Sequence, residues 1–459
     1  MKIIQPFILP NIKLYSPKYD YLDANKITMM SEELLHFVWK FGLFENYLIK
    51  GIEIGGFQII SPGTHNKDAG PDFFNAKIKS GETIWIGNIE IHIKSSDWFR
   101  HGHHNDKAYN NVILQVVVEH DKEIQTESGR NIPVMEIVLD KCIEIKYEEF
   151  KTNNKWIPCQ NDILTVNDFK TKMWLGSVLI ERLNEKSQYI NKILELNKNS
   201  WEETFYQLLA RNFGFKVNAE PFEWLAKSLQ LKYLAKHQSS LLQIEALLFG
   251  QAGFLNAREN DDLYYTNLKK EYEFLRGKFG LIPLEKHLWK FMRLRPPNFP
   301  TIRISQFAAI ISKSKSLFSK IIESENLAEI KQLFEVKASE NWDNRYTFEK
   351  ISDKKEKILG TESINNILIN TIIPLIFAYG LSTNNEMLKE RAINFLEEMK
   401  PETNHIIKAW REIGIVSKAA FYSQALLQQK KNYCEKSKCL ECGIGIEIIK
   451  NQLIKSKIL

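Results

Sequence analysis

The sequence lacks the long apolar runs that mark membrane proteins. Its 459 residues contain no run of 18 uninterrupted apolar side chains, so we expect no membrane-spanning segment. The nearest approach, TIIPLIFAYGL at 371–381, is predicted to be a buried helix. The N-terminal run MKIIQPFILPNIKLY contains two prolines and has no small-residue cleavage site of the kind that a signal peptide needs. These absences indicate a cytoplasmic protein without a membrane partner.

Cysteine is scarce, and several catalytic motifs are missing. Five cysteines are too few and too unevenly placed for a secreted disulfide scaffold. No GxxxxGK[ST] or GxGxxG motif occurs, so nothing indicates nucleotide-driven work. No HExxH spacing occurs either, which weakens a zinc-hydrolase interpretation. The overall composition, 44% hydrophobic and 26% charged, is typical of a globular protein. The length is sufficient for two or three domains.

Charge is divided unevenly along the chain. Residues 1–150 hold 16 Lys and Arg against 21 Asp and Glu, whereas the remaining residues hold 46 against 35. An acidic part beside a basic part suits a polyanion that one part holds and the other cuts. A lysine-rich surface without a partner explains the same numbers.

The pattern of apolar residues predicts an α+β protein with two domains. Residues 1–150 read as a helix after Ser31, three strands, a short helical or loop insert, and further strands. These residues are predicted to form a β-rich domain with a mixed sheet. A polar linker follows at 151–165, and 166–459 is predicted to be a larger, all-helical domain that ends in a cysteine cluster.

The most unusual stretch is GPDFFNAKIKSGETIWIGNIEIHIKSSDW, at residues 70–98. It reads as a β-hairpin whose second strand places Glu90, His92 and Lys94 on one face and isoleucines on the other. Asp72 begins the partner strand, and facing residues of a ladder are about 4.5–5.5 Å apart. Two carboxylates at that distance repel each other unless a cation lies between them. A solvated face of an amphipathic hairpin is the plainer alternative.

A divalent ion gives these residues a chemical purpose. Mg²⁺, or Mn²⁺ in its place, binds through one or two carboxylates and takes its other ligands from water and substrate phosphate. Asp72 and Glu90 are therefore predicted metal ligands. His92 or Lys94 would orient or deprotonate the attacking water in phosphodiester hydrolysis.

Pro71-Asp72, followed after a gap by Glu90-Ile91-His92, resembles the signature of the PD-(D/E)XK nuclease superfamily. The order helix, three strands, helix, strand is similar to the core of that superfamily. The resemblance implies a restriction-endonuclease-like sheet, and it implies that Glu33, or its neighbour Glu32, helps to bind the ion. His92 stands where that signature has lysine, and the nearest lysine on this face is Lys94.

A broader resemblance covers most of the chain. GPDFFNAKI, GNIEIHIKSSDW, HGHHNDKAYNNVILQVVVEHD, RNFGFKVNAEPFEWLA, IEALLFGQAGFL, LRPPNFPTIRISQFA and YCEKSKCLECGIG together resemble an uncharacterised bacterial family whose domain has no assigned function. Members of that family tend to have histidine where this chain has Gln115.

Three histidines lie within four positions in HGHHND, at 101–106. Imidazole prefers zinc or another transition metal to Mg²⁺. His92 with His103 or His104, plus Asp72 or Glu90, would make a three-ligand zinc site with an open position. His103 and His104 are otherwise predicted to contact substrate phosphate, and a solvated loop is the alternative.

Three cysteines close to the C-terminus form a C-x4-C-x2-C pattern. Thiolates at this spacing favour zinc or an iron–sulfur cluster, both of which usually take four protein ligands. The fourth is predicted to be Cys159, and less favourably Cys142. Some PD-(D/E)XK relatives hold an iron–sulfur cluster with a similar set. The predicted structural site consists of Cys159, Cys434, Cys439 and Cys442; reduced thiols without a metal are the alternative.

Arginines and aromatic residues mix in RLRPPNFPTIRISQFA, at 293–308. Arg293, Arg295 and Arg303 are candidates for nucleic-acid contacts by charge and stacking. The alternative is a rigid interhelical loop. Together these features predict a metal-dependent, nuclease-like phosphodiesterase that acts on DNA. The rival hypotheses are a non-catalytic module that binds nucleic acid or protein, and a zinc-dependent hydrolase.

Overall fold

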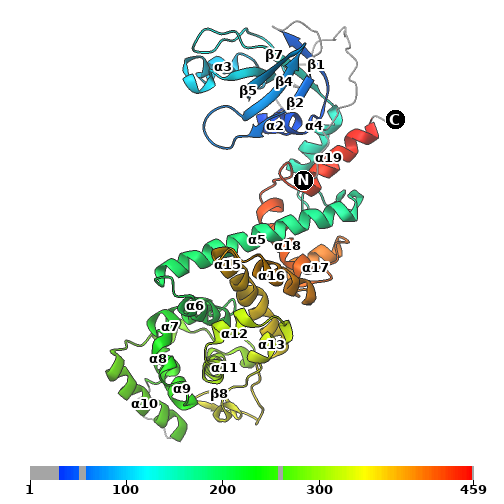
Figure 1. The fold of residues 1–459 in the computed structure, drawn as a ribbon. Coiled ribbons are helices and arrows are strands. Elements are labelled where there is room, and N and C mark those ends of the chain that lie inside the picture. Colours follow the sequence, from blue (N-terminus) through cyan, green and yellow to red (C-terminus); the bar gives the residue numbers. More distant parts are fainter. Residues whose placement is uncertain (1–29, 51–57, 257–261, 457–459) are drawn as a thin grey trace. The chain divides into compact units, whose positions relative to one another are not determined.

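The computed structural model describes residues 30–50, 58–256 and 262–456 (Figure 1). The N-terminal run and residues 51–57, in the region where strands are predicted, lie outside these residues. The chain divides into two compact units. The sheet unit comprises Met1–Trp174 and Lys430–Leu459, and the helical unit comprises Leu175–Gln429. The fold class is α+β, as predicted.

A curled, mixed sheet of seven strands forms the centre of the sheet unit. The strands are β1 (Phe44–Lys50), β2 (Gln58–Ser61), β3 (Thr64–His65), β4 (Phe73–Ser80), β5 (Thr83–Ile91), β6 (Val112–Val117) and β7 (Val134–Leu139). Their order is β1-β7-β6-β5-β4-β2, with β3 also paired to β4. β6 runs parallel to both β5 and β7, whereas the other pairs are antiparallel. All six residues of β6 are buried, as expected of a strand in the middle of a covered sheet.

Helix α2 (Glu32–Phe41) begins where the sequence predicts. Ser31 accepts a hydrogen bond from the backbone N–H of Leu34, which satisfies one of the unpaired donors of the first turn. Gly42 ends the helix in the left-handed conformation, with φ 61°. The apolar face of the helix is buried, and the helix contacts β5 (Figure 1). One end of β5 therefore lies close to the polar residues of the first turns of α2.

The β4–β5 hairpin carries an irregularity that sets its register. Phe73 pairs with Ile89, but the ladder shifts before Ala76 pairs with Gly87. Asn75 lies in this bulge with φ 56°, and its backbone N–H donates to Oδ1 of Asn88. Beyond Phe73, the antiparallel register brings residue 72 opposite residue 90.

Burial changes along β5, and this permits a stability test. Ile89 is fully buried, whereas Ile86 on the same strand is 57% exposed. We expect Ile89→Ala to lower the free energy of unfolding by about 2–5 kcal/mol, since it removes buried methyl groups and leaves a cavity. Ile86→Ala should change it by less than about 0.5 kcal/mol. Urea unfolding followed by circular dichroism measures both, and similar losses in the two variants would contradict the observed burial.

The segment after the sheet is packed, unlike the polar linker predicted at 151–165. Helix α4 (Lys141–Thr152) buries Tyr147 and Phe150, and the following loop buries Ile157 and Ile163. The C-terminal helix α19 (Gly443–Ser456) contacts α4. Residues 430–456, which the sequence assigns to the helical domain, therefore belong to the sheet unit, because apolar side chains of α19 pack there.

The helical unit contains most of the remaining helices. They are α5 (Asp168–Leu196), α6 (Trp201–Phe213), α7 (Ala219–Ser228), α8 (Leu231–Ala235), α9 (Leu241–Gln251), α10 (Leu263–Phe279), α11 (Pro300–Lys313), α12 (Leu317–Glu323), α13 (Leu327–Leu333), α14 (Thr361–Ile367), α15 (Ile373–Ser382), α16 (Glu386–Glu398), α17 (His405–Glu412) and α18 (Ala420–Gln428). The boundary between the units falls inside α5. A small hairpin, β8 (Arg345–Thr347) and β9 (Lys350–Ile351), interrupts the helices.

One continuous helical stretch among the described residues, Thr361–Ser382, is long and apolar enough to cross a membrane by length and composition alone. However, 72% of its most apolar window is buried inside the structure. The buried helix predicted at 371–381 lies in this stretch, which behaves as a core helix of the helical unit.

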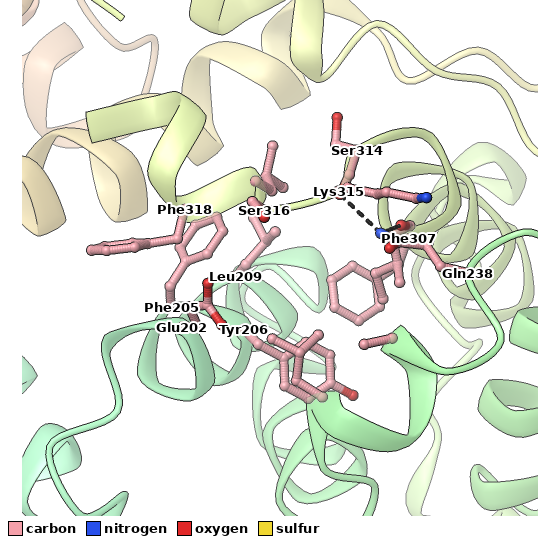
Figure 2. Close-up of a pocket in the computed structure, with 14 residues that line it drawn as sticks. Glu202, Phe205, Tyr206, Leu209, Gln238, Phe307, Ser314, Lys315, Ser316 and Phe318 are labelled. Carbon is pink, nitrogen blue, oxygen red and sulfur yellow. Dashed lines mark hydrogen bonds between the residues drawn. The ribbon is translucent and has the colours of Figure 1, made fainter. Parts of the chain in front are cut away.

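The helical unit also contains a pocket of about 410 Å³ (Figure 2). Its lining includes Phe205 and Tyr206 from α6, Phe307 from α11 and Phe318 from α12. This volume falls within the range of small-ligand sites. The pocket is lined by none of the residues for which the sequence predicts catalysis or metal binding.

Candidate metal centre

The two carboxylates predicted to hold a metal converge at the end of β5. The backbone N–H of Asp72 donates to Oε2 of Glu90 at 3.2 Å, and the backbone N–H of Ile91 donates to Oδ2 of Asp72 at 2.8 Å. Each carboxylate thus bonds to the backbone beside the other. This follows from the ladder register, which continues from Phe73 and Ile89 to the next pair.

The polar face of β5 is buried, so a solvated hairpin face does not describe it. Glu90 is 5% exposed and His92 is 1% exposed. Burial, followed by the nearby charge of Asp72, raises the pKa of Glu90 to about 9. A carboxyl group with this pKa is protonated at neutral pH unless a cation replaces the proton. The site therefore favours a cation over two bare carboxylates.

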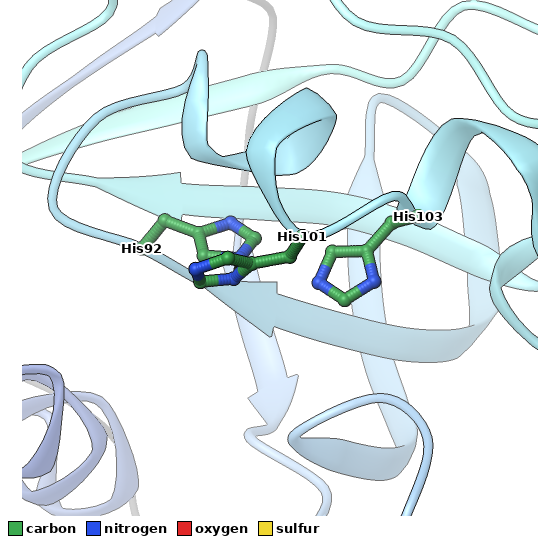
Figure 3. A group of neighbouring side chains, drawn as sticks. All are labelled: His92, His101 and His103. Carbon is green, nitrogen blue, oxygen red and sulfur yellow. Dashed lines mark hydrogen bonds between the residues drawn. The ribbon is translucent and has the colours of Figure 1, made fainter.

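Three imidazoles lie beside these carboxylates. His92, His101 and His103 lie close together (Figure 3). Each has one ring nitrogen that lies within 4.8 Å of a ring nitrogen of each of the other two. Nε2 of His92 lies 3.2 Å from Nδ1 of His101. Oε1 of Glu90 lies 3.1 Å from Nε2 of His103 and 3.6 Å from Nε2 of His92. Imidazole and carboxylate donors therefore face a common point.

The loop after β5 brings the second and third histidines into place. A short helix, α3 (Asp97–Arg100), follows the strand, and Gly102 then adopts φ 78°, a conformation that glycine takes without strain. The ring of His103 stacks on Tyr109, with centroids 3.9 Å apart. Trp98 contacts both rings edge-on. These contacts fix the position of His103, whereas His101 is exposed to solvent.

Gln115 holds the first histidine. It pairs with Glu90 across the β5–β6 ladder, and its Nε2 lies 2.9 Å from Nδ1 of His92. Burial, and then the imidazoles of His103 and His101, lower the pKa of His92 to about 3, so its ring is neutral at physiological pH. A 180° rotation of the Gln115 amide exchanges the positions of its NH₂ donor and its oxygen acceptor. Gln115 can therefore hydrogen-bond to either tautomer of His92. Ligand histidines usually have such a partner for their second nitrogen.

Helix α2 adds two residues to the site. Nε2 of His36 lies 3.2 Å from Oδ2 of Asp72, and this hydrogen bond raises the pKa of His36 although burial opposes it. The pKa of Glu32 is raised by burial and, among other groups, by the charge of Asp72. Glu33, the predicted auxiliary ligand, instead accepts a hydrogen bond from the hydroxyl of Tyr147. Glu32, one position earlier on the helix, is the glutamate that faces the centre.

His36 was not among the predicted site residues. Glu32 and His36 are four residues apart, so they share one face of the helix. That spacing was the signal in the sequence that could have indicated His36. However, the sequence does not show that this face of the helix packs against the hairpin that carries Asp72.

Two other predicted residues lie outside the cluster. The strand ends at Ile91 and the chain bends at Ile93, so the alternation that should place Lys94 beside Glu90 is lost. The ammonium group of Lys94 instead pairs with Glu119 at 3.0 Å. The ring of His104 packs against Phe99 rather than against the other histidines.

The three predicted nucleic-acid arginines belong to the helical unit. Arg303 is buried in α11, and its guanidinium donates to Asn298, Gln306 and Ser363. It stabilises the packing of the unit and does not present its charge to a polyanion. Arg293 and Arg295 are exposed in the preceding loop.

The donor chemistry fits a divalent transition metal. Carboxylate oxygens alone suit Mg²⁺ and Mn²⁺, whereas neutral imidazoles suit iron, zinc and other later transition metals better. Asp72, Glu90, His92, His101 and His103 offer both types. The predicted cysteine ligands form a separate buried group near the start of α19.

Comparison with curated proteins and with solved structures finds no match. A family model described as "Protein of unknown function (DUF2851)" matches residues 32–405, which include the metal-centre residues and most of the helical unit. The broad resemblance to an uncharacterised family is thereby confirmed. The chain belongs to the DUF2851 family of proteins of unknown function.

Proposed function

We propose that the protein is a metal-dependent phosphodiesterase that acts on DNA. The observation that supports this most directly is the convergence of Asp72 and Glu90 in a partly buried site beside three imidazoles. A bound divalent ion supplies Lewis acidity there, lowering the pKa of a water molecule and neutralising charge on the phosphodiester. The imidazoles favour Mn²⁺ over Mg²⁺ as this ion.

The protein's own residues have separate tasks in this proposal. Asp72 and Glu90 would hold the ion together with His92 and His103. His36 orients the carboxylate of Asp72. His101 is the exposed histidine, so we assign the positioning of the attacking water to it. Lys94, paired with Glu119, is not assigned this task.

The element order also supports the proposal. Helix α2 precedes the antiparallel β4–β5 pair, with β1, β2 and β3 between them, and the short α3 and the parallel strand β6 come after the pair. This order is similar to the helix, strands, helix, strand order that the PD-(D/E)XK resemblance implies. The acidic residues lie at the start of β4 and near the end of β5, beside the first helix. The choice of DNA rests on this resemblance and on the basic balance of residues 151–459.

The direct test is cleavage of linear and single-stranded DNA in the presence of Mn²⁺ or Mg²⁺. We expect the wild type to cleave with Mn²⁺ and Glu90→Ala to be inactive. Glu82→Ala is a matched control, since Glu82 lies in the turn of the same hairpin and is exposed. Cleavage that is equal in all three proteins would end the assignment of Glu90 to the active site. Salt-sensitive DNA binding without turnover in any metal would instead identify a non-catalytic binding module.

A zinc-dependent hydrolase is the second candidate, because three imidazoles with one carboxylate suit zinc. This candidate predicts Zn²⁺-dependent hydrolysis of bis(p-nitrophenyl) phosphate that competing DNA does not inhibit. The nuclease proposal predicts inhibition by DNA. The two outcomes separate the candidates.

A further inference from the structure

Four buried cysteines form a second group of metal-ligand side chains in the sheet unit. None of the five cysteines, all of which lie among the described residues, is part of a disulfide. Of the buried ones, Cys434 ends the short helical segment Gln429–Cys434, two more lie in the loop between this segment and α19, and the fourth lies after α4. They are Cys159, Cys434, Cys439 and Cys442. Cys142, which is partly exposed, contacts Ser456 instead.

Other contacts bring the two cysteine segments together. The ammonium group of Lys430 donates to the backbone carbonyl of Trp156 at 2.8 Å and lies 5.0 Å from the centre of its ring. Helix α19 contacts the short turn Ile163–Thr165, which follows Cys159. The geometry of both flanks thus places the segment that carries three cysteines against the segment that carries the fourth.

The loop itself is tightly folded. The backbone N–H of Ser437 donates to the carbonyl of Cys434, and that of Cys442 donates to the carbonyl of Cys439. A Cβ atom on Gly445 would lie 2.2 Å from the carbonyl oxygen of Cys439, so only glycine permits this approach. The thiols are held in a compact turn at the start of α19.

The four thiols are near enough to interact with one another. Cys159 interacts electrostatically with Cys434, Cys442 and Cys439, and Cys439 interacts with Cys442. All four are buried away from solvent. Buried thiols that lie near one another are the ligands that a thiophilic cation takes.

We propose that Cys159, Cys434, Cys439 and Cys442 form a tetrathiolate site for a structural metal centre. The shared chemistry is four thiolates around zinc or an iron–sulfur cluster. The centre would join segments 275 positions apart in sequence and fix the C-terminal helix to the sheet unit. It is independent of the proposed phosphodiesterase activity, since none of these cysteines belongs to the Asp72–Glu90 cluster.

The test begins with the full-length wild type, purified without oxygen and reconstituted separately with Zn²⁺ and with iron and sulfide. Elemental analysis, acid-labile sulfide and the visible spectrum distinguish the two sources. We expect about one zinc ion or one cluster per chain. Iron with sulfide and a brown colour identifies a cluster, and colourless protein with zinc identifies a single ion. Less than about 0.1 equivalents of both metals would overturn the proposal.

Substitutions locate the centre. Cys439→Ser and Cys159→Ser should each lower the metal content at least about tenfold, whereas Cys142→Ser should leave it unchanged. Equal metal content in all three variants would overturn the proposal.

A measurement on the wild type avoids dependence on the folding of these variants. Titration with an organomercurial should release the metal in proportion to the modification of the four ligand thiols. The fifth thiol, that of Cys142, should react without releasing metal. Release that is complete before any buried thiol reacts would overturn the assignment of thiolate ligands.

Discussion

Glu90→Gln is expected to lower metal-dependent cleavage by about 10³-fold or more, which corresponds to about 4 kcal/mol of transition-state stabilisation. Glutamine has nearly the shape of the protonated carboxyl group but binds a cation far less well. Because the pKa of Glu90 is about 9, the side chain is already neutral in the metal-free protein at pH 7. The substitution should therefore change metal-free stability little.

This separation of activity from stability is the informative part of the experiment. Thermal unfolding without metal should be similar for the wild type and the variant. Saturating Mn²⁺, at about 100 times its dissociation constant, should stabilise the wild type by about 2.7 kcal/mol and should not stabilise the variant. Glu82→Gln serves as the control and should behave as the wild type. A large loss of metal-free stability in Glu90→Gln would indicate a structural role instead.

The affinity for Mn²⁺ is expected to rise about tenfold for each pH unit between pH 6 and pH 8. Glu90, whose pKa is raised to about 9, must lose a proton when the ion binds, so protons compete with the metal throughout this range. His92, whose pKa is lowered to about 3, is already neutral and adds no competition. Titration calorimetry in buffers of different ionisation enthalpy measures both the affinity and the proton released. An affinity that does not change with pH would contradict this prediction.

Stability without metal should show the corresponding dependence on pH. Between about 4.5 and 9 the folded state binds a proton at Glu90 that the unfolded state has lost, so its contribution to the free energy of unfolding falls as pH rises. His92 acts in the opposite direction between about 3 and 6.5, where the unfolded state binds the extra proton. Of these two groups only Glu90 still contributes above pH 6.5, and His36, whose pKa is also raised, acts in the same direction as Glu90. Urea unfolding at pH 7, 8 and 9, compared with Glu90→Gln, measures the contribution of Glu90.

Local sequence patterns were enough to predict part of the fold and several residues of the site. Ser31 as a helix start and the antiparallel pairing of β4 with β5 were predictable, because capping and alternation depend on neighbouring residues. The same alternation placed Asp72, Glu90 and His92 near one another. What the hairpin alone did not show is that its polar face is buried, because β6 runs parallel beside it and the loop after it folds back over that face.

Residues that depend on tertiary contacts were harder to predict. His36 joins the site only because α2 packs on β5, and Lys94 leaves it because the chain bends after His92. Arg303 looked like a surface cation from its basic neighbours, yet it is buried among polar side chains. The C-terminal segment joined the sheet unit through contacts between residues more than 270 positions apart, for which sequence pattern gives no direct signal.

The proposed activity depends on a divalent ion held between Asp72 and Glu90. Crystals of the protein grown with Mn²⁺, measured by anomalous scattering at the manganese edge, test this most directly. We expect a peak about 2.0–2.3 Å from an oxygen of Glu90 and from oxygen or nitrogen atoms of Asp72 and the histidine group. An ordered site at high Mn²⁺ concentration with no peak between these two carboxylates would contradict the account.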